Sequence, residues 1–498
     1  MVLAVAVTAL TAVPLVFVVV SAVDVGWAEA VRLTWRPRVG ELLWNTTRLA
    51  GGCMVLCAVI GTAAAWLVER CAVPWRRFLS VALAAPLAIP AFVNSYAWVS
   101  VVPSWSGYGG ALLVVTLSYF PFVYLPVAAT LRGLDPAYEE VARSLGLSVF
   151  RVFLRTVLPQ LKPAILGGCL LVGLHLLSEF GALQMLRFPT FTTAIYDQYQ
   201  STFNGPAANM LAGVLVLCCL VLLVAELRMR GRARYARVGA GTARTAEPVR
   251  LRLLTWPAVV GLVALVGLAV AVPMGSLGYW LAVGSSSGLD VDLILVTSAT
   301  TLGLAALGAL VTTAAAIPVA WLQVRRAGRV STLLERSTYI GGALPGIVVA
   351  LALVTISVRL VPEIYQTTAV LLVAYLILMM PRAMVSVRAT LAQAQPVLDD
   401  VAHSLGVSRS ATLRRVTLPL IAPGIGAGAA LVFLGVVTEL TATLLLAPTG
   451  TQTLASRFWL ESDSFAYGAA APYAVLMILL SAPATYLLTR SMRRESTP

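Results

Sequence analysis

Residues able to do acid–base, nucleophilic or metal chemistry are few in this chain of 498 residues. There are two histidines, His175 and His403, and six cysteines without CxxC spacing, a pattern that indicates neither a zinc site nor a disulfide framework. The one lysine, Lys162, lies between Leu161 and Pro163, so the chain lacks the Gly-Lys-Ser/Thr end of a nucleotide-binding P-loop. We therefore expect no catalytic residue, no metal site and no cofactor bound by this chain.

Two carboxylates stand out because their surroundings are apolar. Glu179 and Glu439 lie in hydrophobic stretches, where an ionisable group is costly and usually faces a cavity or a partner. They either line a path for a cationic solute or are hydrogen-bonded residues near the end of a membrane span. His175, one helical turn before Glu179, can share its face. Asn94 and Tyr96 are further candidates for such a path, with membrane-belt packing as the alternative.

Composition places these residues in a polytopic membrane protein. Hydrophobic residues make up 59% of the chain and charged residues 11%, less than half of the usual charged fraction of about 25%. The net charge of +14 comes almost entirely from arginine. Basic residues between apolar spans are typical of cytoplasmic loops, so we expect a lipid environment and no nucleic-acid partner.

Apolar stretches of about 20 residues, the length that crosses about 30 Å of hydrocarbon, predict an all-α protein with about twelve transmembrane helices. The first of them is read as a retained span because it lacks a basic region and a clear cleavage site. The predicted spans lie near residues 1–23, 42–68, 78–101, 108–131, 163–186, 207–227, 253–274, 292–322, 338–360, 366–387, 420–447 and 468–489.

A polar, basic segment occurs twice in this apolar chain. Residues 135–163 read DPAYEEVARSLGLSVFRVFLRTVLPQLKP, and residues 395–423 read QPVLDDVAHSLGVSRSATLRRVTLPLIAP. Each copy predicts a helix that starts with acidic residues, a turn at Gly146 or Gly406, and a second short helix that ends at Leu158-Pro159 or Leu418-Pro419. Duplication at equivalent places favours docking on a soluble partner over a simple interfacial connector.

Other equivalent positions divide the chain into two parallel repeats. Trp66 and Arg70 match Trp321 and Arg325 at an offset of 255, and Glu179 matches Glu439 at an offset of 260. We expect a first half at residues 1–227, a basic linker at 228–252 and a second half at 253–498. With both termini cytoplasmic, the arginine-rich loops and both polar segments fall on the inside.

Both segments resemble the EAA motif, Glu-Ala-Ala-x3-Gly-x9-Ile-x-Leu-Pro, of the membrane subunits of bacterial ABC importers. The spacing from glycine to proline matches in both copies, while valine stands at the second position and aspartate replaces glutamate in the second copy. The resemblance implies that each segment is a coupling helix that fits a groove in an ATP-hydrolysing subunit. The coupling residues carried over are Glu139, Glu140, Ala142, Gly146 and Pro159, and Asp399, Asp400, Ala402, Gly406 and Pro419.

Over nearly the whole chain the sequence resembles fused ferric iron permeases, through LAIPAFVNSYAW at 87–98, SEFGALQMLRFPTFTTAIYDQY at 178–199 and GRARYARVG at 231–239. This resemblance implies an inner-membrane permease with two copies of an ABC ATPase subunit and an extracytoplasmic solute-binding protein as partners. ATP and Mg²⁺ are then bound by the ATPase subunits. Permeases for thiamine, polyamines, phosphonates or sulfate share the architecture. An ion-driven secondary transporter is the alternative outside the class, and it does not explain two EAA segments.

Overall fold

The computed structural model describes residues 1–202, 205–230, 248–284, 290–325, 328–342, 344–394, 401 and 404–494. These residues form helices and no β-strand, with one isolated parallel bridge between Cys71 and Val249. The all-α prediction is confirmed. A helix pairs its own backbone N–H and C=O groups, as a membrane span must, because hydrocarbon offers them no hydrogen-bond partner.

The chain forms two compact units that do not follow the two halves of the sequence. The first unit comprises residues 37–193, 217–286 and 481–498, and the second comprises residues 1–36, 194–216 and 287–480. Three helices contribute residues to both units: α12 (Phe191–Gln200), α13 (Gly205–Arg230) and α25 (Tyr467–Arg494).

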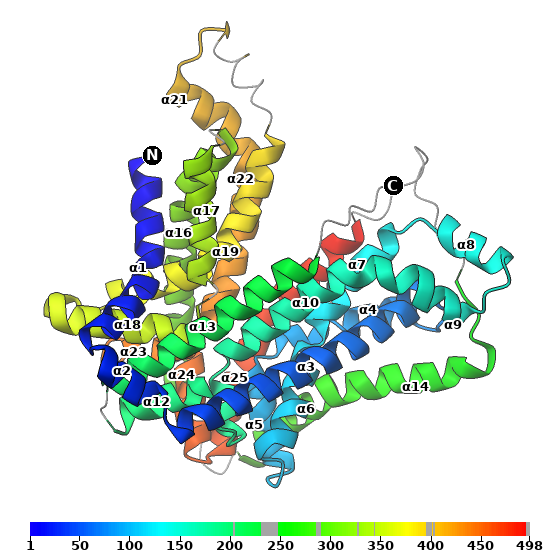
Figure 1. The fold of residues 1–498 in the computed structure, drawn as a ribbon, viewed down its shortest axis with the longest axis horizontal. Coiled ribbons are helices and arrows are strands. Elements are labelled where there is room, and N and C mark those ends of the chain that lie inside the picture. Colours follow the sequence, from blue (N-terminus) through cyan, green and yellow to red (C-terminus); the bar gives the residue numbers. More distant parts are fainter. Residues whose placement is uncertain are drawn as a thin grey trace. The chain divides into compact units, whose positions relative to one another are not determined.

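In the first unit the long helices α3 (Pro37–Arg70), α7 (Pro121–Gly133) and α10 (Leu158–Ser178) pack side by side (Figure 1). Small residues permit the close approach: a Cβ on Gly168 of α10 would lie 2.7 Å from the Cα of Val123 on α7. The other helices of this unit are α4 (Arg76–Ala82), η1 (Ala85–Ala88), α5 (Ala91–Val101), α6 (Gly107–Tyr119), α8 (Ala137–Ser144), α9 (Val149–Val152), η2 (Phe153–Val157), α11 (Gly181–Met185), η3 (Arg252–Leu254), α14 (Thr255–Val266), η4 (Gly267–Ala271) and α15 (Val272–Val283).

The second unit repeats this arrangement with α16 (Val291–Arg325), α19 (Thr368–Gln393) and α22 (Leu418–Val437) packed together (Figure 1). Its other helices are α1 (Val2–Asp24), α2 (Trp27–Thr34), α17 (Arg329–Gly342), α18 (Gly346–Leu360), η6 (Pro362–Ile364), α21 (Arg409–Thr412), η7 (Leu413–Thr417), α23 (Thr441–Leu446) and α24 (Leu454–Asp463).

Each unit also contains the first helix of the other sequence half. Helix α1, at the start of the chain, packs on α16, α17 and α18 of the second unit. Helices α14 and α15, at the start of the second half, pack on α4 and α5 of the first unit. The two halves therefore exchange their first helices.

Among the described residues, nine helices are long and apolar enough to cross a membrane, and a tenth is obtained if the pair Arg76–Ala88 and Ala91–Val101 counts as one span. This pair is bent by 93°, at Ile89 and Pro90. The two remaining predicted positions hold shorter apolar helices, Gly346–Leu360 and Tyr467–Pro483. All twelve predicted spans thus correspond to apolar helices, of which three are bent or short.

Two predicted spans extended too far. The spans predicted at 163–186 and 420–447 end at Ser178 and Val437, and short helices, α11 and α23, follow each break. Apolar composition continues across both breaks, which is why a hydrophobicity pattern cannot detect them.

Candidate functional site

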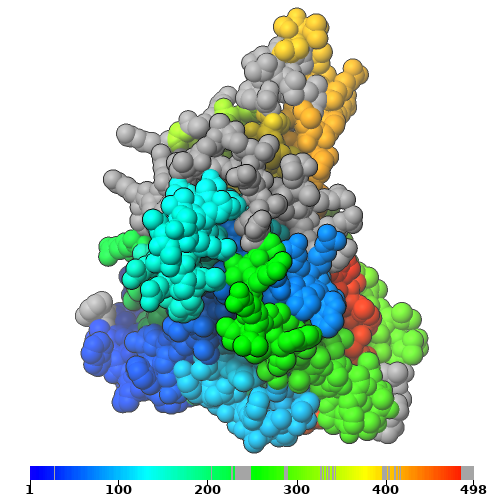
Figure 2. Space-filling model, turned by 90° about the vertical axis from the view of Figure 1, so that its right-hand side faces the viewer, coloured from blue at the N-terminus to red at the C-terminus, as the bar shows by residue number. Residues whose placement is uncertain are grey.

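The first polar segment begins with the short helix α8, whose two faces differ. The Asp135 side chain accepts a hydrogen bond from the Ala137 amide at 3.0 Å and so closes the turn before the helix. Glu139 and Ala142, three residues apart, are buried against the first unit. Glu140 is exposed, as are Val141 and Leu145, whose exposed fractions are 59% and 77%. Figure 2 shows this segment in turquoise at the surface.

Helix α8 ends in a left-handed turn at Gly146, as predicted. The φ angle of Gly146 is +82°, a conformation that glycine adopts without steric cost. The Leu147 amide donates to the Ala142 carbonyl at 3.2 Å, and the Gly146 amide donates to the Arg143 carbonyl at 2.9 Å. This pair of bonds is the Schellman arrangement, which satisfies the last carbonyls of the helix and reverses the chain.

A buried arginine joins α8 to the end of α3. Arg70 Nε lies 3.1 Å from Glu139 Oε1, with exposed side-chain fractions of 5% and 9%. Arg70 Nη2 also donates to the Leu134 carbonyl at 3.4 Å, in the connection between α7 and α8. The more exposed Arg143 lies 3.8 Å from the other oxygen of Glu139. Arg70 thus fixes α8 to a long membrane helix.

The second predicted helix of the motif does not end at Leu158-Pro159. Helix α9 continues through the π-helical turn η2 into α10, and Pro159 lies in the first turn of α10. Proline has no amide hydrogen and its ring crowds the preceding turn, so the wider turn accommodates it. The Phe153 ring in η2 packs on Trp66 of α3, with 5.1 Å between ring centroids.

In the second polar segment, the described residues repeat the features of the first. Asp399, Asp400 and Ala402 lie outside the described residues. Gly406 has a φ angle of +78°, which confirms the second predicted turn, and the π-helical turn η7 precedes Leu418-Pro419. Val401 and Leu405 have exposed fractions of 50% and 77%, close to those of Val141 and Leu145. Both copies therefore present one apolar pair, spaced by one helical turn, to their surroundings.

Each intramembrane glutamate lies at the break of a span and binds the start of the next short helix. Glu179 Oε1 accepts from the Ala182 amide at 2.9 Å, and Oε2 accepts from the Tyr119 hydroxyl at 2.5 Å. Glu439 Oε1 accepts from the Ala442 amide at 2.9 Å, and Oε2 accepts from the amide and the hydroxyl of Thr443 at 3.0 and 2.9 Å. Amides in the first turn of a helix have no carbonyl acceptor within that helix, so they can donate to the glutamate.

The other predicted path residues have packed surroundings. The His175 ring lies 4.4 Å from the Phe122 ring and 5.9 Å from the ring of Tyr119, the residue that donates to Glu179, centroid to centroid. Asn94 is buried and donates to the Ser118 hydroxyl at 2.7 Å, while its Oδ1 lacks a hydrogen-bond partner among the described residues. Tyr96 is buried as well. Their place on a path stays a prediction.

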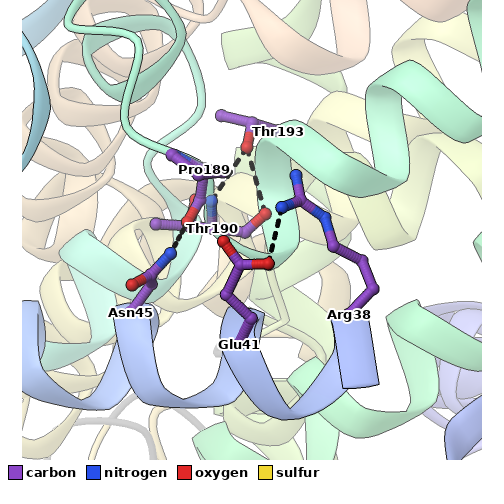
Figure 3. Close-up of polar contacts among 6 residues, drawn as sticks. All are labelled: Arg38, Glu41, Asn45, Pro189, Thr190 and Thr193. Carbon is purple, nitrogen blue, oxygen red and sulfur yellow. Dashed lines mark hydrogen bonds and ion pairs between the residues drawn. The ribbon is translucent and has the colours of Figure 1, made fainter. Parts of the chain in front are cut away.

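Threonines on the long helices anchor the segments that follow the breaks. The Phe191 amide at the start of α12 donates to Thr46 Oγ1 at 3.4 Å, and the Leu454 amide at the start of α24 donates to Thr301 Oγ1 at 2.8 Å. Figure 3 shows the contact next to the first anchor, in which Asn45 donates to the Pro189 carbonyl at 3.1 Å. Thr46 and Thr301 were not predicted, although their offset of 255 matches that of Trp66 and Trp321.

The described part of the chain contains no group of three or more His, Cys, Asp and Glu side chains placed to hold a metal ion. The candidate site is therefore a set of helix junctions: two surface segments that turn at the αL glycines Gly146 and Gly406, and two span breaks at which a glutamate binds the next short helix. Such an arrangement can transmit movement between a surface partner and the broken spans.

Residues 57–231 and 312–496 each match the family described as "Binding-protein-dependent transport system inner membrane component". The two matches cover most of the chain and include both EAA segments and both span breaks. The chain belongs to this family. It is a multi-pass permease of the ABC importer class, and the family's description names both a binding protein and the inner membrane.

Named relatives of this permease transport different solutes. The Fe(3+)-transport system permease protein FbpB 2 of Haemophilus influenzae is 38% identical over 484 residues, which cover 96% of this chain and 95% of the relative. The sulfate transport system permease protein CysT of Escherichia coli is 28% identical over 247 residues, 45% of this chain and 89% of the relative. The molybdenum transport system permease protein ModB of Escherichia coli is 28% identical over 199 residues, 36% of this chain and 86% of the relative. These relatives are transport subunits.

Proposed function

We propose that this permease imports ferric iron, delivered by an extracytoplasmic binding protein and driven by ATP. The observation that carries the cargo assignment is the 38% identity to the Fe(3+) permease over 96% of the chain, both halves included. The relatives named for sulfate and molybdenum match less than half of the chain. Thiamine, polyamines, phosphonates and sulfate are the alternative cargoes that an experiment must distinguish from ferric iron.

In this proposal each EAA segment docks on one copy of an ABC ATPase subunit, so that two copies bind the permease. ATP and Mg²⁺ bind to those subunits, and this chain binds no cofactor. The exposed pairs Val141/Leu145 and Val401/Leu405 support this assignment, because apolar side chains spaced by one turn are typical anchors of a helix in a groove. Glu140 and its counterpart Asp400 are the proposed polar contacts at the rim.

Coupling then runs through the buried side of the segment. Glu139 and Ala142, with Asp399 and Ala402 as their counterparts, hold the helix to the permease, and Gly146 and Gly406 set the turn. Pro159 and Pro419 mark where each segment enters a broken span. Closure of the ATPase subunits moves both segments and exposes the path alternately to the two sides of the membrane.

The proposed path passes the two span breaks. Glu179, with His175 beside it, and Glu439 offer carboxylate oxygens, which suit a hard cation. Their existing hydrogen bonds to helix amides keep any engagement of the cargo weak, as release requires. Asn94 and Tyr96 are retained as proposed path residues.

The proposed topology has both termini in the cytoplasm, with residues 1–227 and 253–498 as the two functional halves and 228–252 as a cytoplasmic linker. Arginine in every predicted inside loop supports this orientation.

Uptake in cells tests the proposal. Cells that express the permease with the neighbouring ATPase and binding protein are expected to accumulate radioactive ferric iron, and depletion of ATP with the proton gradient intact is expected to abolish uptake. An excess of unlabelled sulfate, molybdate or thiamine should leave the rate unchanged. Strong competition by one of these solutes would overturn the cargo assignment, and gradient-driven uptake without the ATPase would overturn the class.

A further inference from the structure

The chain that leads from the linker into α14 pairs with the end of α3. The Val249 amide donates to the Arg70 carbonyl at 2.8 Å, and the Ala72 amide donates to the Val249 carbonyl at 2.9 Å. These two bonds form the parallel bridge between Cys71 and Val249, the one isolated bridge among the described residues. Both views show the green chain before α14 beside the turquoise α8 and α9 (Figure 1, Figure 2).

The bridge is buried on one side. Val249 and Cys71 have exposed fractions of 7% and 1% and belong to the same apolar cluster as Val73 and Leu79. Burial raises the pKa of the Cys71 thiol to about 12, although the nearby charge of Arg143 acts in the opposite direction. Cys71 is therefore an uncharged packing residue, and Val249 fills the space against it.

The residue that Val249 binds is the one that holds the coupling helix. The carbonyl of Arg70 accepts the Val249 amide, and the guanidinium of Arg70 pairs with Glu139 of α8 at 3.1 Å. A main-chain bond at Arg70 restricts the direction in which its side chain leaves the helix end. Val249 and α8 are therefore connected through a shared partner, Arg70.

We propose that the junction segment, residues 248–251, is a clamp that positions the first coupling helix, with Val249 as its positioning residue. This inference rests on the proposed function, because it assigns the clamp a role in the coupling of ATP hydrolysis to transport. The end of the linker, just before the second half, thereby stabilises the coupling helix of the first half. The linker is then a part of the transmission path and more than a tether.

The functional test compares Val249→Pro, which removes the amide donor, and Val249→Asp, which places a charge in the apolar cluster, with Val249→Ile as the conservative variant. The complex of permease, ATPase and binding protein is reconstituted, and iron moved per ATP hydrolysed is measured. We expect this ratio to fall at least threefold in Val249→Pro and Val249→Asp and to be retained in Val249→Ile. Arg250→Ala, at the exposed neighbouring position, is the matched control and should retain the ratio.

Glu139→Gln separates a clamp from a general loss of structure. If Val249 acts through Arg70 and Glu139, then Val249→Pro added to Glu139→Gln should lower the ratio little further, because both changes interrupt one network. If the double variant instead lowers the ratio by the product of the two single effects, Val249 does not act through Arg70 and Glu139, and the clamp is contradicted.

A second measurement is independent of transport. Ala72 and Arg250 lie on the exposed side of the bridge, so Ala72→Cys with Arg250→Cys places two accessible thiols opposite each other. Ala72→Cys with Arg252→Cys is the control, because Arg252 lies beyond the bridge, at the start of the 3-10 helix η3, where its thiol is not held opposite residue 72. The full chain is oxidised in membranes and then cut at a protease site inserted after residue 240.

Fragments that stay joined on a non-reducing gel for the 72/250 pair and separate for the 72/252 pair are the expected result. Separation of both pairs would overturn the clamp. Joined fragments with a normal transport ratio in Val249→Pro would show the contact without the coupling role, which also overturns the proposal. If the wild-type complex moves no iron with ATP while the 72/250 pair still joins, the proposed function fails and the pairing stands.

Discussion

Arg70 and Glu139 form a buried ion pair between the end of α3 and α8, the proposed coupling helix, with 3.1 Å between Nε and Oε1. The pair connects α8, in the first surface segment, directly to the long helix α3. Glu139 directly precedes Glu140, the acid of the EAA pattern, and the two neighbouring glutamates have different surroundings. Glu139 is buried and holds the helix, whereas Glu140 is exposed.

Removal of one partner of this pair should be more harmful than removal of both. Arg70→Gln or Glu139→Gln leaves a buried charge without its partner, at a cost of about 3–5 kcal/mol. The double variant removes both charges and should recover much of that loss. Thermal unfolding of the purified permease measures the difference. Glu69→Gln, in the more exposed pair with Arg132 at 3.6 Å, is the control, and an equal loss there would contradict the argument.

The turns at Gly146 and Gly406 should tolerate asparagine better than valine. A Cβ meets no atom within 4 Å at either position, so the penalty comes from the positive φ angle alone. A β-branched residue in this region costs about 1–3 kcal/mol, while asparagine adopts it more readily. Transport should fall in Gly146→Val and Gly406→Val and be largely kept in the asparagine variants. Gly133→Val, with open space and no positive φ angle, is the control; an equal effect there would refute the role of the turn.

The exposed apolar pairs should determine binding of the ATPase subunits. Leu145→Lys or Leu405→Lys places a charge where a groove-binding anchor is expected, so each should lower the amount of ATPase that co-purifies by about tenfold, a change equivalent to about 1.4 kcal/mol. Insertion and thermal stability should stay the same because both leucines are exposed. Trp35→Lys, another exposed apolar residue, is the control. Full recovery of ATPase with both leucine variants combined would sink the docking assignment.

The threonine anchors should differ in strength. Thr301→Val removes the 2.8 Å bond to the Leu454 amide, and a buried amide without a partner costs about 1–3 kcal/mol. Thr46→Val removes a bond of 3.4 Å and should cost less. Thermal unfolding tests the order. Thr47→Val is the control because its hydroxyl donates to the Leu43 and Trp44 carbonyls of its own helix; a larger effect of Thr46→Val than of Thr301→Val would contradict the ranking.

The repeats, the helical class and the two glycine turns could be predicted because they depend on local composition and on short spacings. Gly146 and Gly406 needed only the position of a helix end. The exchange of first helices between the halves could not be predicted, since α1 is apolar on all sides and its pattern names no partner.

The span breaks at Glu179 and Glu439 were missed for a related reason. Each glutamate was recognised as costly in an apolar stretch, but its role depends on amides of the short helix that follows, which hydrophobicity does not reveal. The partner of Arg70 was missed as well. The repeat identified Arg70, but only the folded path of the chain brings α8 against the end of α3.

Reconstitution tests the central claim most directly. The permease and its ATPase are placed in proteoliposomes with ATP inside and the binding protein, loaded with ferric iron, outside. Iron should enter only when ATP and the binding protein are both present, and the Leu145→Lys and Leu405→Lys double variant should stop uptake. Iron uptake by this permease alone, or ATP-driven uptake that the double variant leaves unchanged, would contradict the account.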